Sequence, residues 1–204
     1  MKQLTLTEFE LEYETGAYVL DFRQAIEFVD GFIPASYYMN ARFLKSHIRG
    51  EMIHPTETII LIASNHAISD IHRELEKLGY SNIIGWLKGG FETWKEADKK
   101  IDIAISIEAD ELMMDMKYDD PQVIDIRSAE AFDAMHLENA ENIPVENLVF
   151  NLDDLPKDGI FYLYDEDGEL SLSIISALKN QGLHNYYHIT GGFNALKQNE
   201  ASMA

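Results

Sequence analysis

The chain repeats itself with a period of about one hundred residues. The string VLDFR at 19–23 returns as VIDIR at 123–127, 104 positions later, and the apolar run that begins at Ile59 has a counterpart that begins at Phe161. Near the end of each half stands the tripeptide GGF, at 89–91 and 191–193. Self-similarity at this spacing predicts two copies of one fold, because 204 residues suffice for two cores of about 100 residues each. We therefore expect two domains, 1–100 and 101–204.

Within each half, short apolar segments alternate with segments of helical periodicity. The helical segment of the first half places apolar residues three or four positions apart, at Ile68, Ile71, Leu75 and Leu78. The second half repeats this spacing at Leu170, Ile174 and Leu178. Short apolar strands that alternate with such helices are typical of a parallel sheet covered on both faces. The sequence thus predicts an α/β fold, with a central, mainly parallel sheet flanked by helices in each domain.

The formal charge of −20 is unevenly distributed along the chain. Residues 1–100 carry 11 Lys and Arg against 15 Asp and Glu, whereas residues 101–204 carry 5 against 21. A charge of this sign argues against nucleic acid and anionic membranes, which are bound through Lys and Arg, and it favours a basic protein partner for the second half. No segment has the pattern of a membrane span or a secretory signal, so we expect a soluble, cytoplasmic protein. The oligomeric state is left open.

From Asp125 the second half reads DIRSAEAFDAMHLENAENIP, which resembles the rhodanese signature D-x-R-x-x-x-E-F-x-x-G-H-I-x-G-A-x-N-I-P. Asp125, Arg127 and His136 are among the residues that match in register. The first half keeps Asp21 and Arg23 but has Phe32 in place of the histidine. The resemblance implies two tandem rhodanese-like domains and an activity of the thiosulfate:cyanide sulfurtransferase type. We interpret the matching Asp, Arg and His residues as structural, because an Asp and an Arg two positions apart can tie down the loop that follows a strand.

The resemblance places the functional site in a loop of the form C-x-x-G-x-x-S, which follows a strand and leads into a helix. The chain contains no cysteine, so neither loop offers the thiolate on which the family's chemistry depends. The second loop reads DEDGELS: Asp165 stands at the Cys position, Gly168 and Ser171 are kept, and Glu166, Asp167 and Glu169 add three further acids. We expect four acids around one concavity to repel thiosulfate and phosphate. The Asp165 carboxylate is expected to act as a built-in ligand of the helix N-terminus.

The first loop reads ASNHAIS and leaves two alternatives open. Aligning Ser69 with the final Ser of the pattern puts Ala63 at the Cys position, whereas a one-residue shift puts Ser64 there. His66 is a candidate ligand-binding residue, since it is the titratable side chain of this loop.

These observations favour a catalytically inactive rhodanese-like protein that binds or regulates a partner through its acidic second domain. The candidate ligand-binding residues are Asp165, Glu166, Asp167, Gly168, Glu169, Ser171, His66 and Ser69. We predict no cofactor and no metal ion. Two alternatives remain: sulfurtransferase activity, as the resemblance implies, and cation binding by the acidic loop. The loop departs from the calcium-binding pattern, because Leu163 and Ile174 stand where that pattern requires acids.

Overall fold

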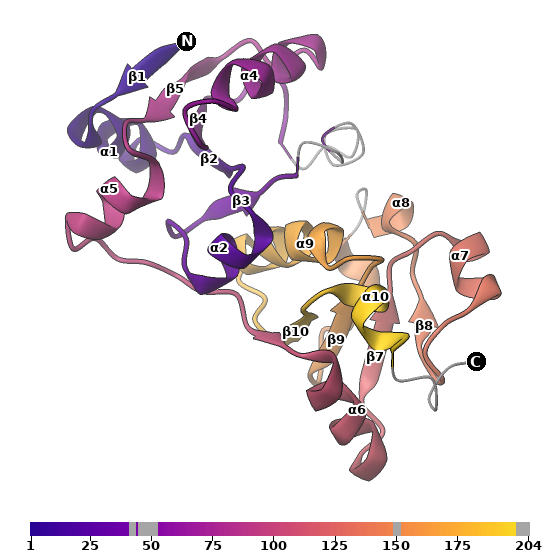
Figure 1. Cartoon of the computed structure of the whole chain (residues 1–204). Coiled ribbons are helices and arrows are strands. Elements are labelled where there is room, and N and C mark those ends of the chain that lie inside the picture. Colours follow the sequence, from indigo (N-terminus) through magenta and orange to yellow (C-terminus); the bar gives the residue numbers. More distant parts are fainter. Residues whose placement is uncertain (41–43, 45–52, 149–151, 199–204) are drawn as a thin grey trace. The chain divides into compact units, whose positions relative to one another are not determined.

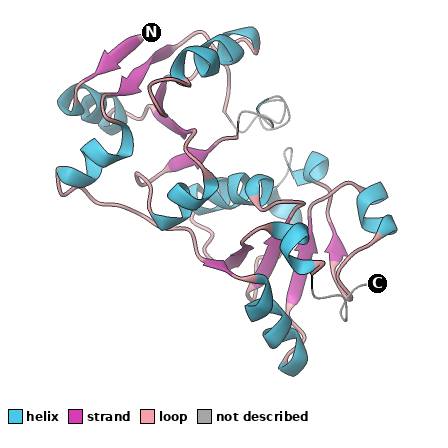
Figure 2. Cartoon of the chain, in the orientation of Figure 1, coloured by secondary structure: helices cyan, strands magenta, loops and turns pink. Residues whose placement is uncertain are grey.

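The computed structural model describes residues 1–40, 44, 53–148 and 152–198. The chain divides into two compact units, Met1–Ile103 and Ala104–Ala204. Each unit contains a five-stranded sheet in which all neighbouring strands run parallel, with helices around it (Figures 1 and 2). The predicted α/β class, with a parallel sheet and flanking helices in each half, is therefore confirmed.

The sheet of the first unit has the strand order β1-β5-β4-β2-β3. Its strands are β1 (Lys2–Leu4), β2 (Tyr18–Asp21), β3 (Ser36–Tyr38), β4 (Ile59–Ile62) and β5 (Ile83–Leu87). The helices are α1 (Leu6–Glu14), α2 (Ala25–Asp30), α4 (Ile68–Lys77) and α5 (Gly90–Glu96). Successive residues of β4 face opposite sides of the sheet: Ile59 and Leu61 pack with apolar residues of α4, and Ile60 and Ile62 with those of α1 and α5. A continuous apolar run is therefore required in this strand.

The second unit repeats this order as β6-β10-β9-β7-β8. Its strands are β6 (Ser106–Ile107), β7 (Gln122–Asp125), β8 (Glu141–Asn142), β9 (Phe161–Tyr164) and β10 (Tyr186–Ile189). The helical elements are α6 (Ala109–Tyr118), α7 (Ala129–Ala134), α8 (Val145–Leu148), the 3-10 turn η1 (Leu152–Asp154), α9 (Glu169–Asn180) and α10 (Gly192–Leu196). Residues of α6 and α10 form one core cluster with Tyr162, Tyr164 and Ile189 of the sheet. The face of the sheet that carries these three side chains is thus the one that α6 and α10 cover.

The strand register makes the two units comparable residue by residue. In the parallel ladders, Asp21 lies opposite Ile62, and Asp125 lies opposite Tyr164. The residues that follow, Ala63 after β4 and Asp165 after β9, therefore occupy the same position in the two units. Of the two alternatives for the first loop, the register selects Ala63 rather than Ser64 as the counterpart of Asp165.

Candidate functional site

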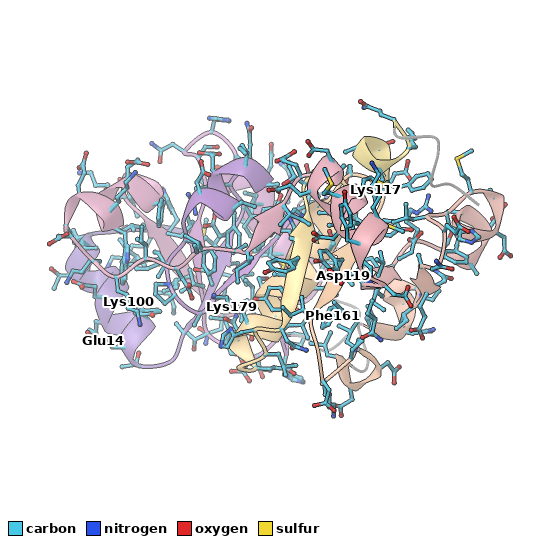
Figure 3. The ribbon with its side chains drawn as sticks, turned by 90° about the horizontal axis from the view of Figure 1, so that it is seen from below. Glu14, Lys100, Lys117, Asp119, Phe161 and Lys179 are labelled. Carbon is cyan, nitrogen blue, oxygen red and sulfur yellow. The ribbon has the colours of Figure 1, made fainter. Side chains whose placement is uncertain are left out.

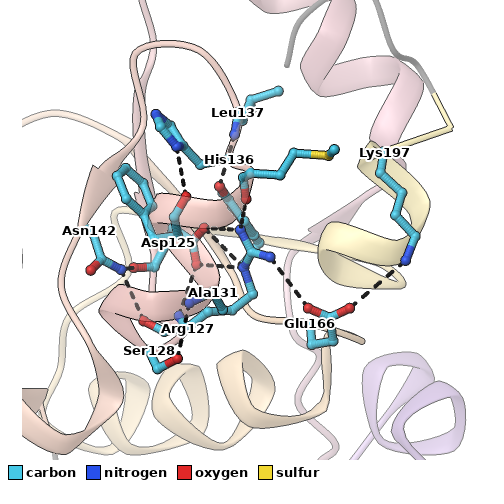
Figure 4. A network of polar contacts seen from close by, with 12 residues as sticks. Asp125, Arg127, Ser128, Ala131, His136, Leu137, Asn142, Glu166 and Lys197 are labelled. Atoms are coloured by element: carbon cyan, nitrogen blue, oxygen red, sulfur yellow. Dashed lines mark hydrogen bonds and ion pairs between the residues drawn. The ribbon is translucent and has the colours of Figure 1, made fainter. Parts of the chain in front are cut away.

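In each unit, one central strand ends in a fully buried aspartate that binds the arginine two residues later. Arg127 donates to Asp125 through its backbone N–H at 2.9 Å and through Nη2 at 2.7 Å, and its Nε adds a further bond (Figure 4). Arg23 binds Asp21 in the same way, with an Nη2–Oδ2 distance of 2.6 Å. Burial raises the pKa of Asp21, and the Arg23 guanidinium opposes that rise. Each carboxylate therefore depends on its arginine for compensation of its buried charge.

The same arginines also hold the segment that follows the next helix. Nη2 of Arg127 donates to the carbonyl of Met135, and Nη2 of Arg23 to the carbonyl of Gly31, at 2.8 Å in both units. The two acceptors stand eight residues after their arginines, at matching positions of the repeat. The pair thus ties the end of a strand to the loop beyond α2 or α7.

A phenylalanine lies under each arginine. The Cζ atom of Arg23 is 4.0 Å from the ring centroid of Phe91, and that of Arg127 is 3.6 Å from the ring centroid of Phe193. At this distance a guanidinium is attracted by the aromatic face. Both rings come from the repeated GGF tripeptide, so the contact links that motif to the Asp-x-Arg motif. The sequence shows the phenylalanine of each GGF tripeptide but does not reveal its arginine partner.

Asp165, at the Cys position of the second loop, is only 3% exposed. Its Oδ1 accepts bonds from the backbone N–H of Ser171 at 3.2 Å and from the Ser171 hydroxyl at 2.8 Å, and its Oδ2 accepts one from the N–H of Leu170 at 3.1 Å. These donors belong to the first turn of α9, whose free N–H groups favour negative charge. Burial raises the pKa of Asp165, and the bonds from Ser171 and Leu170 act against that rise. The expected capture of this carboxylate by the helix N-terminus is confirmed.

The other acids of the second loop make separate contacts. Oε2 of Glu166 lies 3.4 Å from Nη1 of Arg127, and its Oε1 lies 3.9 Å from Nζ of Lys197 (Figure 4). Asp167 accepts a bond from the backbone N–H of Glu169 at 3.3 Å. Asp165 and Asp167 are therefore held by the chain's own donors, and Glu166 is held by its own cations; the repulsion of thiosulfate and phosphate by this loop stays a prediction.

The described residues give no support to cation binding by this loop. Among them, no three His, Asp or Glu side chains lie together closely enough to hold a metal ion. The reason is visible in the loop itself, where the Asp165 oxygens turn toward α9 and the Glu166 oxygens turn toward Arg127 and Lys197.

The loop is also held from the sheet, by a histidine that the sequence analysis did not single out. His188 of β10 is 2% exposed, its Nε2 is 2.7 Å from the carbonyl of Gly168, and its Nδ1 is 2.9 Å from Oγ of Ser106. Burial lowers the pKa of His188 to about 4, so the ring is neutral at pH 7. Because a carbonyl can only accept, the proton lies on Nε2, and the Ser106 hydroxyl donates to Nδ1. A lone histidine inside the apolar strand YYHI was the signal in the sequence.

The corresponding place in the first unit is an open cavity of about 350 Å³. Its lining includes Arg23, Ala63, Ser64, His66 and Phe91, which combines three sequence-predicted site residues with the arginine and its aromatic partner. Ser64 and His66 are exposed, and their Oγ and Nε2 atoms are 3.2 Å apart. The position that holds a carboxylate in the second unit is thus taken by a buried alanine in the wall of this cavity.

Ser69 does not join this site. It lies exposed in the first turn of α4 and does not line the cavity, whereas Ser171 of the second unit is fully buried against Asp165. The two loops therefore differ in how they meet their helices as well as in sequence.

His136 is placed as a partner of its own segment. Its Nδ1 is 2.9 Å from the carbonyl of Phe132, and its ring stacks on that of Phe132 with centroids 3.8 Å apart. In the first unit, Phe28 and Phe32 form the matching stack at 4.1 Å. A phenylalanine can thus replace the histidine because the position is used for ring stacking.

None of the helices in the described ranges combines the length and the apolar character that crossing a bilayer requires.

A search among curated proteins finds no match to the chain.

Several solved structures are similar to parts or all of the chain. A rhodanese-related protein of Thermoplasma volcanium is 23% identical, with 49% of this chain and 97% of that chain covered and a TM-score of 0.44. A thiosulfate sulfurtransferase from Pseudomonas aeruginosa is 16% identical, with 100% and 43% covered and a TM-score of 0.43. SseA from Escherichia coli, described with 3-mercaptopyruvate sulfotransferases, is 14% identical, with 93% and 97% covered and a TM-score of 0.42.

The family assignment rests on the sequence of both units. Residues 5–97 and 108–199 each match the rhodanese-like domain, so the match covers most of the chain. The resemblance stated from the signature residues is thereby confirmed. The chain belongs to the rhodanese-like domain family as a tandem of two such domains, and it contains no cysteine.

Proposed function

We propose that this protein is a catalytically inactive rhodanese-like tandem that serves as a binding or regulatory module. The observation that carries the proposal is the content of the two Cys positions. Ala63 offers a methyl group, which has no lone pair with which to attack sulfur. Asp165 offers a carboxylate whose oxygens already accept three hydrogen bonds at the start of α9. Neither side chain can carry a persulfide.

The geometry of the second unit supports inactivity in another way. The N–H groups of Leu170 and Ser171 and the Ser171 hydroxyl are the donors that could receive a small anion at the start of α9. The chain's own carboxylate already takes them. An incoming thiosulfate would have to displace Asp165 and would meet Glu166 beside it.

A basic protein is the partner that the charge of the second domain favours. Most acids of this domain lie on its surface; the exposed ones that the structure describes are Glu108, Asp110, Glu111, Asp119, Asp120, Glu130, Asp133, Glu138, Glu141, Glu146, Asp153, Asp154, Asp158 and Glu166. A surface of one sign attracts a partner of the opposite sign and speeds its association at low salt. We propose that the second domain docks such a partner.

Two experiments test this function. In the first, purified protein is assayed for thiosulfate:cyanide sulfur transfer, where we expect no turnover above buffer. Measurable turnover would establish the alternative, a sulfurtransferase, and refute inactivity.

In the second experiment, the full chain is used to capture partners from a native extract. Changing Asp110, Asp120, Glu130 and Asp133 to their amides should reduce capture of basic proteins, whereas the same change at Glu14, Asp30, Glu96 and Asp98 of the first domain should not. Equal capture by the two variants would refute docking through the second domain.

A further inference from the structure

The second unit contains a cavity that shares no residue with the Asp165 loop. It has a volume of about 340 Å³ and lies where α6 meets the sheet. The residues that line it are Ile107, Glu111, Met114, Asp115, Tyr162 and Tyr187. Ligand pockets of proteins begin at about 300 Å³, so this cavity suits a group of side-chain size. Its lining combines two aromatic rings, two carboxylates and no basic residue.

Two tyrosines form the aromatic part of the cavity. Tyr162 of β9 and Tyr187 of β10 are paired in the parallel ladder, and their ring centroids are 5.3 Å apart at an angle of 38°. The Tyr162 hydroxyl donates to Oδ2 of Asp115 at 2.8 Å, which fixes its ring beside the carboxylate. Burial raises the pKa of Tyr162, and the charges of Asp115 and of Asp119, the residue that follows α6 (Figure 3), add to the rise. The Tyr162 ring therefore stays neutral beside the two carboxylates.

The carboxylates come from one face of α6. Glu111 and Asp115 are four residues apart, and Met114, which is 53% exposed, lies between them on the same side of the helix. The cavity thus offers an apolar surface from Met114 and Ile107 next to two acidic groups. This combination matches a ligand with an aliphatic stem and a cationic head.

In the first unit, the residue that corresponds to Glu111 pairs with a cation from the chain itself. Glu8 and Glu111 correspond, since each is the third residue of its helix and caps that helix through its side chain. In the first unit, Nζ of Lys2 lies 2.6 Å from Oε1 of Glu8. Lys2 pairs with Gly85 in the first sheet, and Ser106 pairs with His188 in the second. The counterpart of Gly85 is Tyr187, the residue before His188. The counterpart of Lys2 is therefore Ile105, the residue before Ser106. The second unit has therefore exchanged the lysine for an isoleucine.

The tyrosines are also particular to the second unit. The ladder registers place Tyr162 at the position of Ile60 and Tyr187 at the position of Gly85. A side chain at Gly85 would collide with the backbone of Lys2, since a Cβ atom there would lie 2.2 Å from the Lys2 carbonyl oxygen. The first unit therefore lacks the aromatic pair, whereas in the second unit Tyr162 and Tyr187 pack against the core beneath α6 and also line the cavity.

We propose that this cavity binds the ammonium group of a lysine side chain from a basic protein partner. The stem of the lysine lies along Met114 and Ile107, and the head is placed between the carboxylates of Glu111 and Asp115 and the ring face of Tyr187. The inference rests on the proposed function in taking the partner to be a basic protein, and it adds the site and the group that is recognised. Lys2 and Glu8 of the first unit are the internal precedent for the ion pair.

The test uses the full chain and two capped tripeptides, glycine-lysine-glycine and glycine-norleucine-glycine. Norleucine keeps the four-carbon stem and lacks the ammonium, so the pair isolates the charge. Binding is followed by NMR through the Met114 methyl group and the Tyr187 ring. We expect the lysine peptide to shift these signals and the norleucine peptide to leave them in place. Glu111→Gln and Tyr187→Ala should each weaken binding about two- to fivefold, the range of one exposed ion pair or cation–π contact.

The control variant is Glu138→Gln, which removes an exposed charge outside the cavity and should leave the affinity unchanged. The proposal is wrong if the norleucine peptide shifts the same signals, if the lysine peptide shifts none of them, or if Glu138→Gln weakens binding as much as Glu111→Gln does. These outcomes do not depend on the capture experiment. A cavity that binds the lysine peptide in a protein that captures no basic partner would leave this site standing and refute the proposed function.

Discussion

Replacing Asp165 removes the acceptor for three buried donors at the start of α9, and the loss can be worked out from the contacts. Asp165→Ala leaves the N–H groups of Leu170 and Ser171 and the Ser171 hydroxyl without their acceptor, and Ser171 is 0% exposed. Losing a helix N-terminal acceptor costs about 0.5–2 kcal/mol, and an unpaired buried donor costs about 1–3 kcal/mol. Release of the buried charge and entry of water offset part of this sum. We expect the free energy of unfolding to fall by about 2–3 kcal/mol.

Asp165→Asn is the milder change and gives the expected order. Its oxygen can still accept from Ser171, but its amide group places a donor opposite the N–H of Leu170. The loss should be about 1 kcal/mol. Glu138→Gln removes one exposed negative charge and should change the stability by less than about 0.5 kcal/mol. Urea unfolding of the three variants and the unaltered protein measures this series.

A small carboxylate added to Asp165→Ala separates an internal ligand from a residue that only fills space. Formate at 100 mM that binds the vacated helix start with a Kd of about 10 mM would return roughly 1.4 kcal/mol and raise the Tm by a few degrees. The unaltered protein should not respond, because its own carboxylate holds the site. The reasoning is refuted if Asp165→Ala is as stable as the unaltered protein, or if formate stabilises both equally.

Three other changes probe the second unit's buried polar groups and the cavity of the first unit. Burial lowers the pKa of His188 from 6.5 to about 4. The stability that its neutral ring contributes above pH 6.5 should therefore be lost as the pH falls toward 4, by about 3 kcal/mol. The unfolding midpoints of the unaltered protein and of His188→Gln should converge over this range, and midpoints that do not converge would contradict this role. Arg127→Lys should cost about 2–4 kcal/mol in urea unfolding because a lysine cannot supply the forked contact to a buried carboxylate, and a loss below about 0.5 kcal/mol would count against that role. Ala63→Cys introduces a thiol at an open cavity, and it should react with a thiol reagent several times faster than Asp165→Cys in the folded protein; equal rates would show that the two sites are equally closed.

The fold could be predicted from sequence because its signals are local or repeated. Strings such as VLDFR and VIDIR mark the same strand twice, and the helical spacing at Ile68, Ile71 and Leu75 predicts the buried face of α4 without knowledge of its neighbours. The capture of Asp165 was predictable for the same reason, since its donors lie five and six residues away. Contacts within one loop and one helix turn follow from chain geometry.

The missed contacts join segments far apart in the sequence. His188 meets Ser106 across 82 residues and Gly168 across 20, and pairing of this kind is set by the sheet register. The ion pairs of Glu166 could not be predicted from the loop alone, because Arg127 and Lys197 come from other parts of the sequence. The choice between Ala63 and Ser64 likewise depends on the pairing of β2 with β4, which the loop sequence does not show. Residue type and spacing predicted which groups were present, but only tertiary packing decided which groups met.

The Asp-x-Arg pairs explain how a rhodanese-like fold can keep its family motif without the family's nucleophile. Asp21 and Asp125 are both 0% exposed, and each is held by an arginine that also binds a distant carbonyl and stacks on a phenylalanine. Removing one member of such a pair leaves an uncompensated buried charge, at a cost of about 3–5 kcal/mol. The motif residues are therefore held by folding in both units, whereas the residue at the Cys position differs between them, Ala63 in one and Asp165 in the other. The motif accordingly reports the fold, and the side chain at position 63 or 165 reports the chemistry.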